Sequence, residues 1–213
     1  LREALEAVAA RGEATLELLD AVASFGERVS ARSTAAVLRK RGIDAVHADA
    51  FDLGMLTDAN FGGAEPLLES ADLLRAGVAA LVDAGKVPVV TGFIGRTLDG
   101  RVTTLGRGGS DYSAAILGAA VHADEIEIWT DVEGCYNCDP RLVPDAYLLK
   151  TLSYKEAMEL SYFGAKVLHP KTIAPVAQFH IPCLIKNSFN PQGPGTLIGV
   201  DQGDDDLGGK SGL

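Results

Sequence analysis

Helical stretches alternate with short runs of β-branched residues along nearly the whole chain, and this alternation restricts the fold more than any other feature. Such a pattern is typical of α/β proteins whose sheet is largely parallel. We expect strands at residues 43–48, 87–91, 126–130, 182–186 and 196–200. We expect helices at residues 1–40, 67–84, 110–121, 153–163 and 170–179.

Small and polar residues mark the breaks in this pattern. Residues 24–26 should interrupt the first helical stretch. Gly85 should end the helix predicted at residues 67–84. Residues 58–66 are rich in Gly, Asn and Pro and predict a loop, and residues 98–109 predict turns with one extended piece. Residues 201–213, with three consecutive Asp, predict an acidic, glycine-containing linker or tail.

Composition excludes several classes of partner. With 29 Asp and Glu against 19 Lys and Arg, the net charge is −10, so the chain lacks the basic surface that nucleic acid requires. The richest apolar run, residues 76–82, is far shorter than the roughly 18 residues that span a membrane. Three cysteines do not form a disulfide framework and fit a reducing cytoplasm. We therefore expect a cytoplasmic protein that binds neither nucleic acid nor membrane.

A glycine-rich turn runs directly into a predicted helix at TLGRGGSD, residues 104–111. Glycines let the backbone approach a ligand closely, and the free N–H groups of a helix start attract a phosphate or carboxylate. The turn is not a Walker A loop, because no GK[ST] follows, and Asp111 occupies the place of the third glycine of a dinucleotide fingerprint. The alternative is a helix capped by Ser110 or Asp111 after a flexible loop.

A second group of polar residues follows the predicted strand at 126–130. Thr130 and Asp131 stand at its carboxyl end, where ligands of open parallel sheets bind. An Asp at a strand end is also a common turn former, so these two residues alone leave both interpretations open. Trp129 lies within the apolar strand and is expected in the core rather than as a stacking platform.

Four motifs together resemble the aspartate kinases, in order and in spacing: GFIG at Gly92, TLGRGGSDYSAA at Thr104, WTDVEGCYNCDPR at Trp129 and SYFGAKVLHPKT at Ser161. SFGERVSA at Ser24 is similar to the substrate-side helix of that family, NFGGAEP at Asn60 to its following loop, and GPGTLIG at Gly193 to the end of its kinase domain. The resemblance covers nearly the whole chain.

The resemblance implies the amino acid kinase fold, a three-layer α/β/α sandwich with a mostly parallel sheet. It implies transfer of the γ-phosphoryl group of ATP to the side-chain carboxylate of L-aspartate, which makes 4-phospho-L-aspartate, the first step of lysine, threonine and methionine biosynthesis. Residues implied to bind aspartate are Glu27, Phe93, Arg107 and Ser110. Residues implied to bind the nucleotide are Thr130, Asp131, Tyr136, Arg141, Lys166 and Val167.

The residue types agree with these roles. Arg107 offers a planar guanidinium for two-point recognition of a carboxylate, and Glu27 offers the charge that an α-ammonium group requires. Asp111 and Arg107 are the expected catalytic residues, but Asp111 is not expected to act as a general base, because a carboxylate nucleophile is already ionised at neutral pH. We expect Asp111 to orient a lysine or the substrate amine. Mg²⁺ should enter with ATP and keep several waters, so no protein residue is assigned to the metal.

Aspartate kinases begin with a strand and a KFGG-type loop whose lysine contacts the transferring phosphate, and this chain begins at Leu1 without them. We expect residues 1–200 to be a catalytic domain that lacks its N-terminal strand, and this span alone to be inactive and poorly folded. Residues 201–213 would lead towards an ACT regulatory region, and in some relatives towards a homoserine dehydrogenase. The full-length protein is expected to be a homo-oligomer.

Two other classes of function remain open at this level. Glutamate 5-kinase, acetylglutamate kinase and uridylate kinase share the fold, and a substrate panel would separate them from an aspartate kinase. A non-catalytic remnant held by a partner chain is the second alternative. The charged residues that the chain retains speak against it, namely Arg107, Asp111, Asp131, Arg141 and Lys166. Cys135 and Cys138 have zinc-like spacing, but no second pair completes four ligands.

Overall fold

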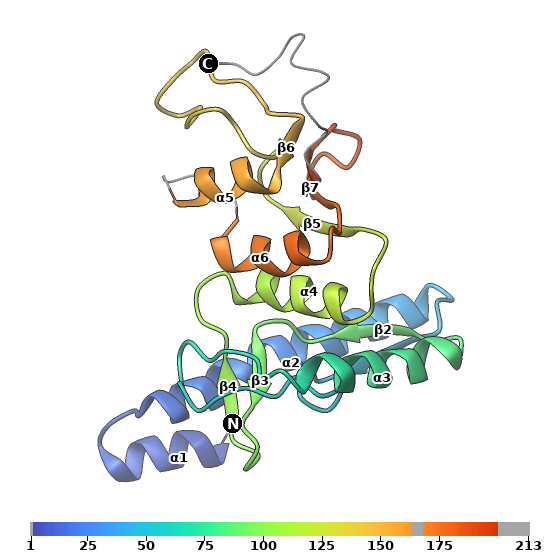
Figure 1. The fold of residues 1–213 in the computed structure, drawn as a ribbon. Helices are drawn as coiled ribbons and strands as arrows, with labels where there is room; N and C mark the ends of the chain where they lie inside the picture. The colour runs from blue at the N-terminus through green and yellow to red at the C-terminus, as the bar shows by residue number, and fades with distance from the viewer. Residues whose placement is uncertain (1, 163–167, 200–213) are drawn as a thin grey trace. The chain divides into compact units, whose positions relative to one another are not determined.

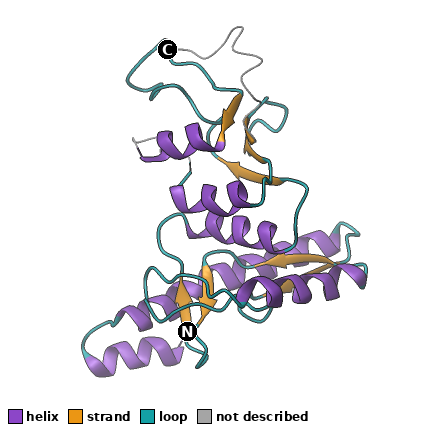
Figure 2. Cartoon of the chain, viewed as in Figure 1, coloured by secondary structure: helices purple, strands orange, loops and turns teal. Residues whose placement is uncertain are grey.

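The computed structural model describes residues 2–162 and 168–199 (Figure 1). The chain divides into two compact units, Leu1–Val121 and His122–Leu213, and each is described by itself. Both units combine helices with strands (Figure 2), and three of the five strand pairs in the described residues are parallel. The predicted α/β class is confirmed.

The first unit carries two short sheets. Strands β1 and β2 pair in parallel, with Ala45 opposite Val87, and β3 and β4 pair antiparallel, with Ile94 opposite Thr104. Helix α2 contacts β1, β2 and β4, and helix α3 contacts β2 and α4. The elements are α1 (Arg2–Arg11), α2 (Leu16–Lys40), β1 (Ala45–Ala48), α3 (Ser70–Asp83), β2 (Val87–Val90), β3 (Ile94–Arg96), β4 (Val102–Thr104) and α4 (Gly109–Ala120).

Helix α2 is continuous, so the predicted interruption at residues 24–26 is wrong. The hydroxyl of Ser24 donates to the carbonyl of Ala21 at 2.7 Å, inside the helix, and a glycine at position 26 is tolerated in a long helix that packs on strands. The break lies earlier, at Gly12, which has a φ of 71°. Thr15 then caps α2 by accepting a hydrogen bond from the amide of Leu18.

Buried apolar side chains hold α3 and α4 together. Ala50, Met55, Leu74 and Ala120 form one cluster, and Leu53 and Ile116 pack against it among others.

Strand β2 is only partly as predicted, because Val87 is exposed and the rest of the strand is half-buried rather than buried. Strand β3 was not predicted, because it has only three residues and its central residue is Gly95. A glycine is needed at that position, since an added Cβ would lie 2.6 Å from the side chain of Thr57.

An ion-pair cluster around the buried Asp49 ties α2 to the end of β1. Asp49 is 4% exposed and lies 2.8 Å from Arg28 Nε and 2.9 Å from Arg32 Nη1. Burial alone would raise the pKa of Asp49, but hydrogen bonds from Arg32 and Arg28 and their charges outweigh burial and lower it. This depressed pKa means that the ionised carboxylate stabilises the folded state.

Replacing Asp49 by asparagine should lower the free energy of unfolding by about 2 kcal/mol at pH 7, since both arginines lose a charged partner but stay partly exposed. The contribution is fully present above the unfolded pKa of about 3.9 and is lost as pH falls through the lower folded pKa. Denaturant titrations of wild type and Asp49→Asn across pH measure the difference. Asp44→Asn, which breaks the exposed pair with Lys86, should change stability little, and equal effects of the two variants would contradict this assignment.

The second unit has one four-stranded sheet, in the order β5-β7-β8-β6. Strands β5 and β7 are parallel, β7 and β8 antiparallel, and β8 and β6 parallel. Helix α5 contacts β6, β8 and α6. The elements are β5 (Ile126–Thr130), β6 (Thr151–Ser153), α5 (Tyr154–Tyr162), α6 (Pro170–Gln178), β7 (Cys183–Asn187) and β8 (Thr196–Gly199).

The two faces of this sheet differ in burial. Ile126, Ile128 and Ile185 are buried on one face, whereas Glu127 and Trp129 point to the other. Trp129 is 46% exposed, with the ammonium group of Lys186 lying 5.8 Å from its ring, so the prediction of a core tryptophan is wrong. The alternation of β5 places every second residue on the open face.

Strand β6 was also missed, because its first two residues were unassigned and Ser153 was included in the following helix.

Candidate functional site

The predicted amino acid pocket forms within the first unit. It has a volume of about 300 Å³, near the lower end of the range for small-molecule sites. Helix α2, the loop after β2 and the start of α4 contribute its walls. The lining residues are Glu27, Phe93, Gly106, Gly108, Gly109, Ser110 and Asp111. Four of the predicted site residues, Glu27, Phe93, Ser110 and Asp111, are thus brought together.

The glycine-rich turn forms one wall without a side-chain cap. Gly106 and Gly108 have φ values of 75° and 68°, a conformation that favours glycine. Gly108 is the residue before α4, and no side chain caps the helix there. The alternative of a helix capped by Ser110 or Asp111 is therefore contradicted, because both residues lie inside α4. The amide of Gly109 donates to the carbonyl of Gly106 at 3.0 Å, so the amides of Ser110 and Asp111 in the first turn of α4 are the ones that can meet an anion.

Phe93 is held in a strained conformation, with its ring packed against Gly109 at the start of α4. Its φ is 67°, which is rare for an aromatic residue. Its amide donates to the hydroxyl of Ser113 at 2.9 Å, and its carbonyl accepts from the amide of Leu105 at 2.9 Å. These bonds fix the backbone on both sides of the ring, so Phe93 is positioned by α4 and by the segment that leads into the turn.

Two carboxylates face this pocket. Burial raises the pKa of Glu27 and the pKa of Asp111, because each ionised carboxylate is partly removed from water. Neither has an ion-pair partner within residues 2–162 and 168–199. A cationic group in the pocket would relieve both costs, which suits an ammonium group.

Arg107 is placed differently from the other predicted residues. It lies between Gly106 and Gly108 at the pocket wall, but its side chain is exposed and does not line the pocket. A long side chain on a glycine-flanked turn is able to reach a ligand carboxylate at the pocket mouth. Its predicted role therefore stays a prediction.

The predicted nucleotide residues of the second unit begin at the carboxyl end of β5. Thr130 pairs in register with Asn187 of β7, and its carbonyl accepts from the amide of Ser188 at 2.8 Å. Asp131 follows and is exposed. Two parallel strands thus end side by side at these residues, as expected of a ligand-binding edge.

Tyr136 and Arg141 lie in the segment that follows. Tyr136 is half-buried and forms an isolated bridge with Leu148. Arg141 is exposed and binds Asp139 through two guanidinium nitrogens, at 3.0 and 2.7 Å, which raises the pKa of Arg141 further. Lys166 and Val167 lie outside the described residues, as does the predicted tail at 201–213.

Sequence reasoning missed a carboxylate that shapes this strand edge. The carboxylate of Glu133 accepts from the side-chain Nδ2 of Asn187 at 2.7 Å and from the side-chain Nδ2 of Asn190 at 3.1 Å. Gly193 packs against the same group, because an added Cβ would lie 2.9 Å from Glu133. The only sequence signal was the position of Glu133 within the WTDVEG motif.

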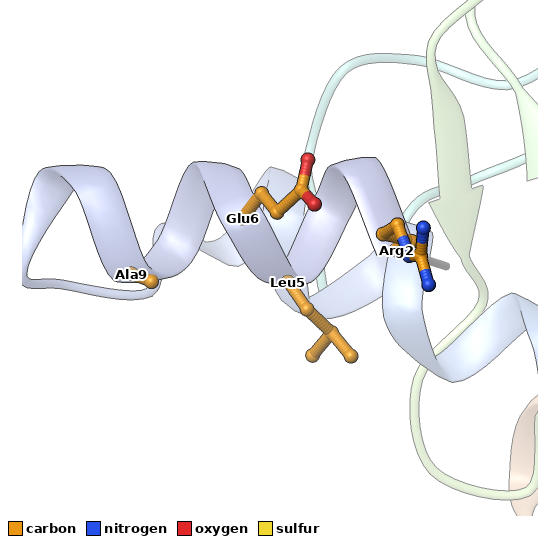
Figure 3. A pocket seen from close by; sticks show the side chains of 4 residues that line it. All are labelled: Arg2, Leu5, Glu6 and Ala9. Atoms are coloured by element: carbon orange, nitrogen blue, oxygen red, sulfur yellow. The ribbon is translucent and has the colours of Figure 1, made fainter.

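Other features of the described residues do not form a competing site. A larger hollow beside α1 is lined by Arg2, Leu5, Glu6 and Ala9, with Leu5 and Glu6 pointing to opposite sides of the helix (Figure 3). Within residues 2–162 and 168–199, no three His, Cys, Asp or Glu side chains are grouped to hold a metal ion. No helix in these ranges has both the length and the hydropathy to cross a membrane.

Comparison with known proteins places this geometry among the amino acid kinases. The model of the amino acid kinase family matches residues 2–187. The chain is 44% identical over 211 residues to the bifunctional aspartokinase/homoserine dehydrogenase 1 of Arabidopsis thaliana, covering 99% of this chain and 23% of that protein. It is 54% identical over 140 residues to the bifunctional aspartokinase/homoserine dehydrogenase of Haemophilus influenzae, covering 66% of this chain and 17% of that protein. The chain spans less than a quarter of either relative.

Solved structures show the same likeness. The E. coli aspartokinase III in complex with aspartate and ADP superimposes with a TM-score of 0.80 at 40% identity, covering 87% of this chain and 41% of that one. The aspartate kinase of Clostridium acetobutylicum gives a TM-score of 0.73 at 36% identity, covering 89% and 41%. The UMP kinase of Bacillus anthracis, at 16% identity and a TM-score of 0.60, covers 92% and 74% and shares the fold alone. The predicted fold class is confirmed.

Proposed function

This chain belongs to the amino acid kinase family, and from that premise we propose that it is the catalytic region of an aspartate kinase. The observation that carries the proposal is the pocket in which Glu27 and Asp111 face the glycine-rich turn at the start of α4. An amino acid with a second carboxylate needs an anion to meet its ammonium group and donors to meet its acids, and this pocket offers both. The solved relative that carries aspartate and ADP supports this assignment.

In the proposed reaction, a side-chain carboxylate oxygen of L-aspartate attacks the γ-phosphorus of ATP. A new O–P bond forms, the bond to the β-phosphate oxygen breaks, and the products are 4-phospho-L-aspartate and ADP. The nucleophile is already ionised near neutral pH, so no proton has to be removed. Catalysis then depends on aligning the two substrates and on neutralising the phosphoryl oxygens.

Each pocket residue has a separate proposed task. Glu27 pairs with the α-ammonium group and Arg107 with a carboxylate, while Phe93 and Ser110 set the shape and polarity of the walls. Asp111, whose pKa is raised by burial, is proposed to orient a cation near the phosphate rather than to act as a base. Binding of the ammonium group would favour the ionised forms of both acids.

For the nucleotide we propose Thr130, Asp131, Tyr136, Arg141, Lys166 and Val167. The paired carboxyl ends of β5 and β7 support the first two assignments. Mg²⁺ would be carried by the phosphates and would neutralise their charge, with no protein ligand assigned. Within the chain itself, Arg141 must exchange its contact with Asp139 for a phosphate contact, or share it.

The wider biology is also a proposal. We infer a role in lysine, threonine and methionine biosynthesis, in a homo-oligomeric full-length protein of the cytoplasm. The aspartokinase names of the relatives support the biosynthetic role. Several of those relatives are named chloroplastic, so the compartment depends on the organism.

A substrate panel tests the proposed function. The full-length protein that carries this chain is incubated with ATP and Mg²⁺ and with L-aspartate, L-glutamate, N-acetylglutamate or UMP, and acyl phosphate is trapped as its hydroxamate while ADP release is measured separately. Aspartate should give hydroxamate with a kcat/KM at least about a hundredfold above the other acceptors. A preference for glutamate or for UMP would overturn the proposal, and residues 1–213 alone are expected to be inactive.

A further inference from the structure

A second carboxylate of α2, which sequence reasoning did not single out, is buried behind the pocket. Asp20 is 4% exposed. Its Oδ2 accepts from the amide of Gly62 and from the amide of Thr104, both at 2.9 Å, and its Oδ1 accepts from the hydroxyl of Thr104 at 2.7 Å. One side chain therefore joins helix α2, the loop around residue 62 and the end of β4.

The two segments that Asp20 joins also touch each other beside the pocket. The amide of Ala64 donates to the carbonyl of Thr104 at 2.9 Å. Gly106, which lines the pocket, packs so closely on the loop that an added Cβ would lie 2.9 Å from the carbonyl oxygen of Gly62. Gly106 follows Thr104 by only two residues and packs on the loop around Gly62. Asp20 therefore holds both the strand end and the loop that position Gly106.

Asp20 and Glu27 lie seven residues apart on α2, close to two helical turns, so they share a face of the helix. Asp20 fixes this face to the strand and loop that lead into the glycine-rich turn. Glu27 lies on the same face and lines the pocket. The hydrogen bonds that Asp20 makes outside the pocket therefore connect the helix face that carries Glu27 to the segments that lead into the turn.

We propose that Asp20 is a positioning residue for the acceptor: its three hydrogen bonds set the spacing between Glu27 and the glycine-rich turn, and thereby the affinity for the amino acid. This inference rests on the proposed function of the same pocket. Asp20 acts through the geometry of its hydrogen bonds and not through its charge. An asparagine at position 20 can keep all three bonds, because its oxygen accepts from the two amides while the Thr104 hydroxyl turns to accept from its NH₂ group. An alanine loses all three.

The test compares Asp20→Ala, Asp20→Asn and wild type in the full-length protein, with the KM for the acceptor and the KM for ATP measured separately. Asp20→Ala should raise the acceptor KM about tenfold or more and leave the ATP KM within about twofold, whereas Asp20→Asn should stay within about threefold of wild type. If Asp20→Ala does not fold, Thr104→Val, which removes one bond, should raise the acceptor KM by about threefold, and Thr104→Ser should restore it.

Ser70→Ala is the matched control. The buried hydroxyl of Ser70 accepts from the amide of Leu56 at 3.0 Å and donates to its carbonyl at 2.7 Å, and Ser70 does not line the pocket. Its loss should lower the melting temperature without changing either KM. If the Asp20 and Thr104 variants also lose stability while their acceptor KM is unchanged, or if the ATP KM rises equally, Asp20 has no positioning role.

Failure of the proposed function would be visible in wild type alone. The KM is measured for whichever acceptor wild type prefers, because the inference concerns the spacing of the pocket walls. If wild type phosphorylates none of the acceptors, amide hydrogen exchange provides the readout. Exchange at Gly62 and through residues 104–111 should then become faster in Asp20→Ala than in Ser70→Ala, and equal rates would overturn the inference.

Discussion

Replacing Glu27 by glutamine is expected to raise the KM for aspartate about a hundredfold, because the α-ammonium group would lose its charged partner in a partly buried site. The same change should make the ligand-free protein more stable. Burial raises the pKa of Glu27, so the folded state disfavours its ionised form, and glutamine removes that cost without changing the shape of the side chain.

The sign of the pH dependence follows from the raised pKa. Below the unfolded pKa of about 4.3 the side chain is protonated in both states and the two proteins should be equally stable. As pH rises through the unfolded and then the folded pKa, wild type should fall progressively below Glu27→Gln. Denaturant titrations between about pH 4 and pH 8, with kinetics of the full-length protein at pH 7, measure both effects.

Glu13→Gln serves as the control for removing a carboxylate. Glu13 is exposed in the turn before α2 and does not line the pocket, so neither the KM nor the stability should change noticeably. If Glu27→Gln binds aspartate as well as wild type does, Glu27 does not meet the ammonium group. The proposed orientation of the substrate would then have to be reversed.

Replacing Gly109 by alanine should lower the free energy of unfolding by about 1–3 kcal/mol, the usual cost of overpacking, and raise the KM for aspartate about tenfold. An added Cβ would lie 2.6 Å from Cδ2 of Phe93 and 3.2 Å from Cβ of Leu105. The backbone of Phe93 is held by Ser113 and Leu105, so its ring is the part that must move. Because Gly109 and Phe93 both line the pocket, movement of the Phe93 ring distorts the acceptor site.

Gly26→Ala provides a comparison with the opposite sign. Gly26 lies in the middle of α2, and an added Cβ would meet nothing within 4 Å. Alanine there should raise the free energy of unfolding by about 0.5–1 kcal/mol, because it restricts the unfolded chain without a clash. Equilibrium unfolding of the two variants measures both changes. A Gly109→Ala variant that is as stable as wild type would show that the pocket wall yields without cost.

Local patterns were sufficient to predict most of the secondary structure. The helix at α4 and the strand at β5 were predicted nearly to the residue, because each is set by a run of like side chains and by glycines or polar residues at its ends. Short elements were harder. Strands β3 and β6 have three residues each, so neither carries enough of an alternating pattern to distinguish a strand from a turn.

The amino acid sequence by itself determined the α/β class, the glycine-rich turn at the start of α4 and the types of residue that the pocket needs. Only the tertiary structure decided that Glu27 and Asp111 face one pocket, that Arg107 lies at its exposed edge and that Trp129 is on an open sheet face. The role of Asp20 also emerged only from the folded chain. The reason is physical: propensity and capping act between residues a few positions apart, whereas Asp20 contacts Thr104, and Glu27 shares a pocket with Asp111, only after the chain has packed.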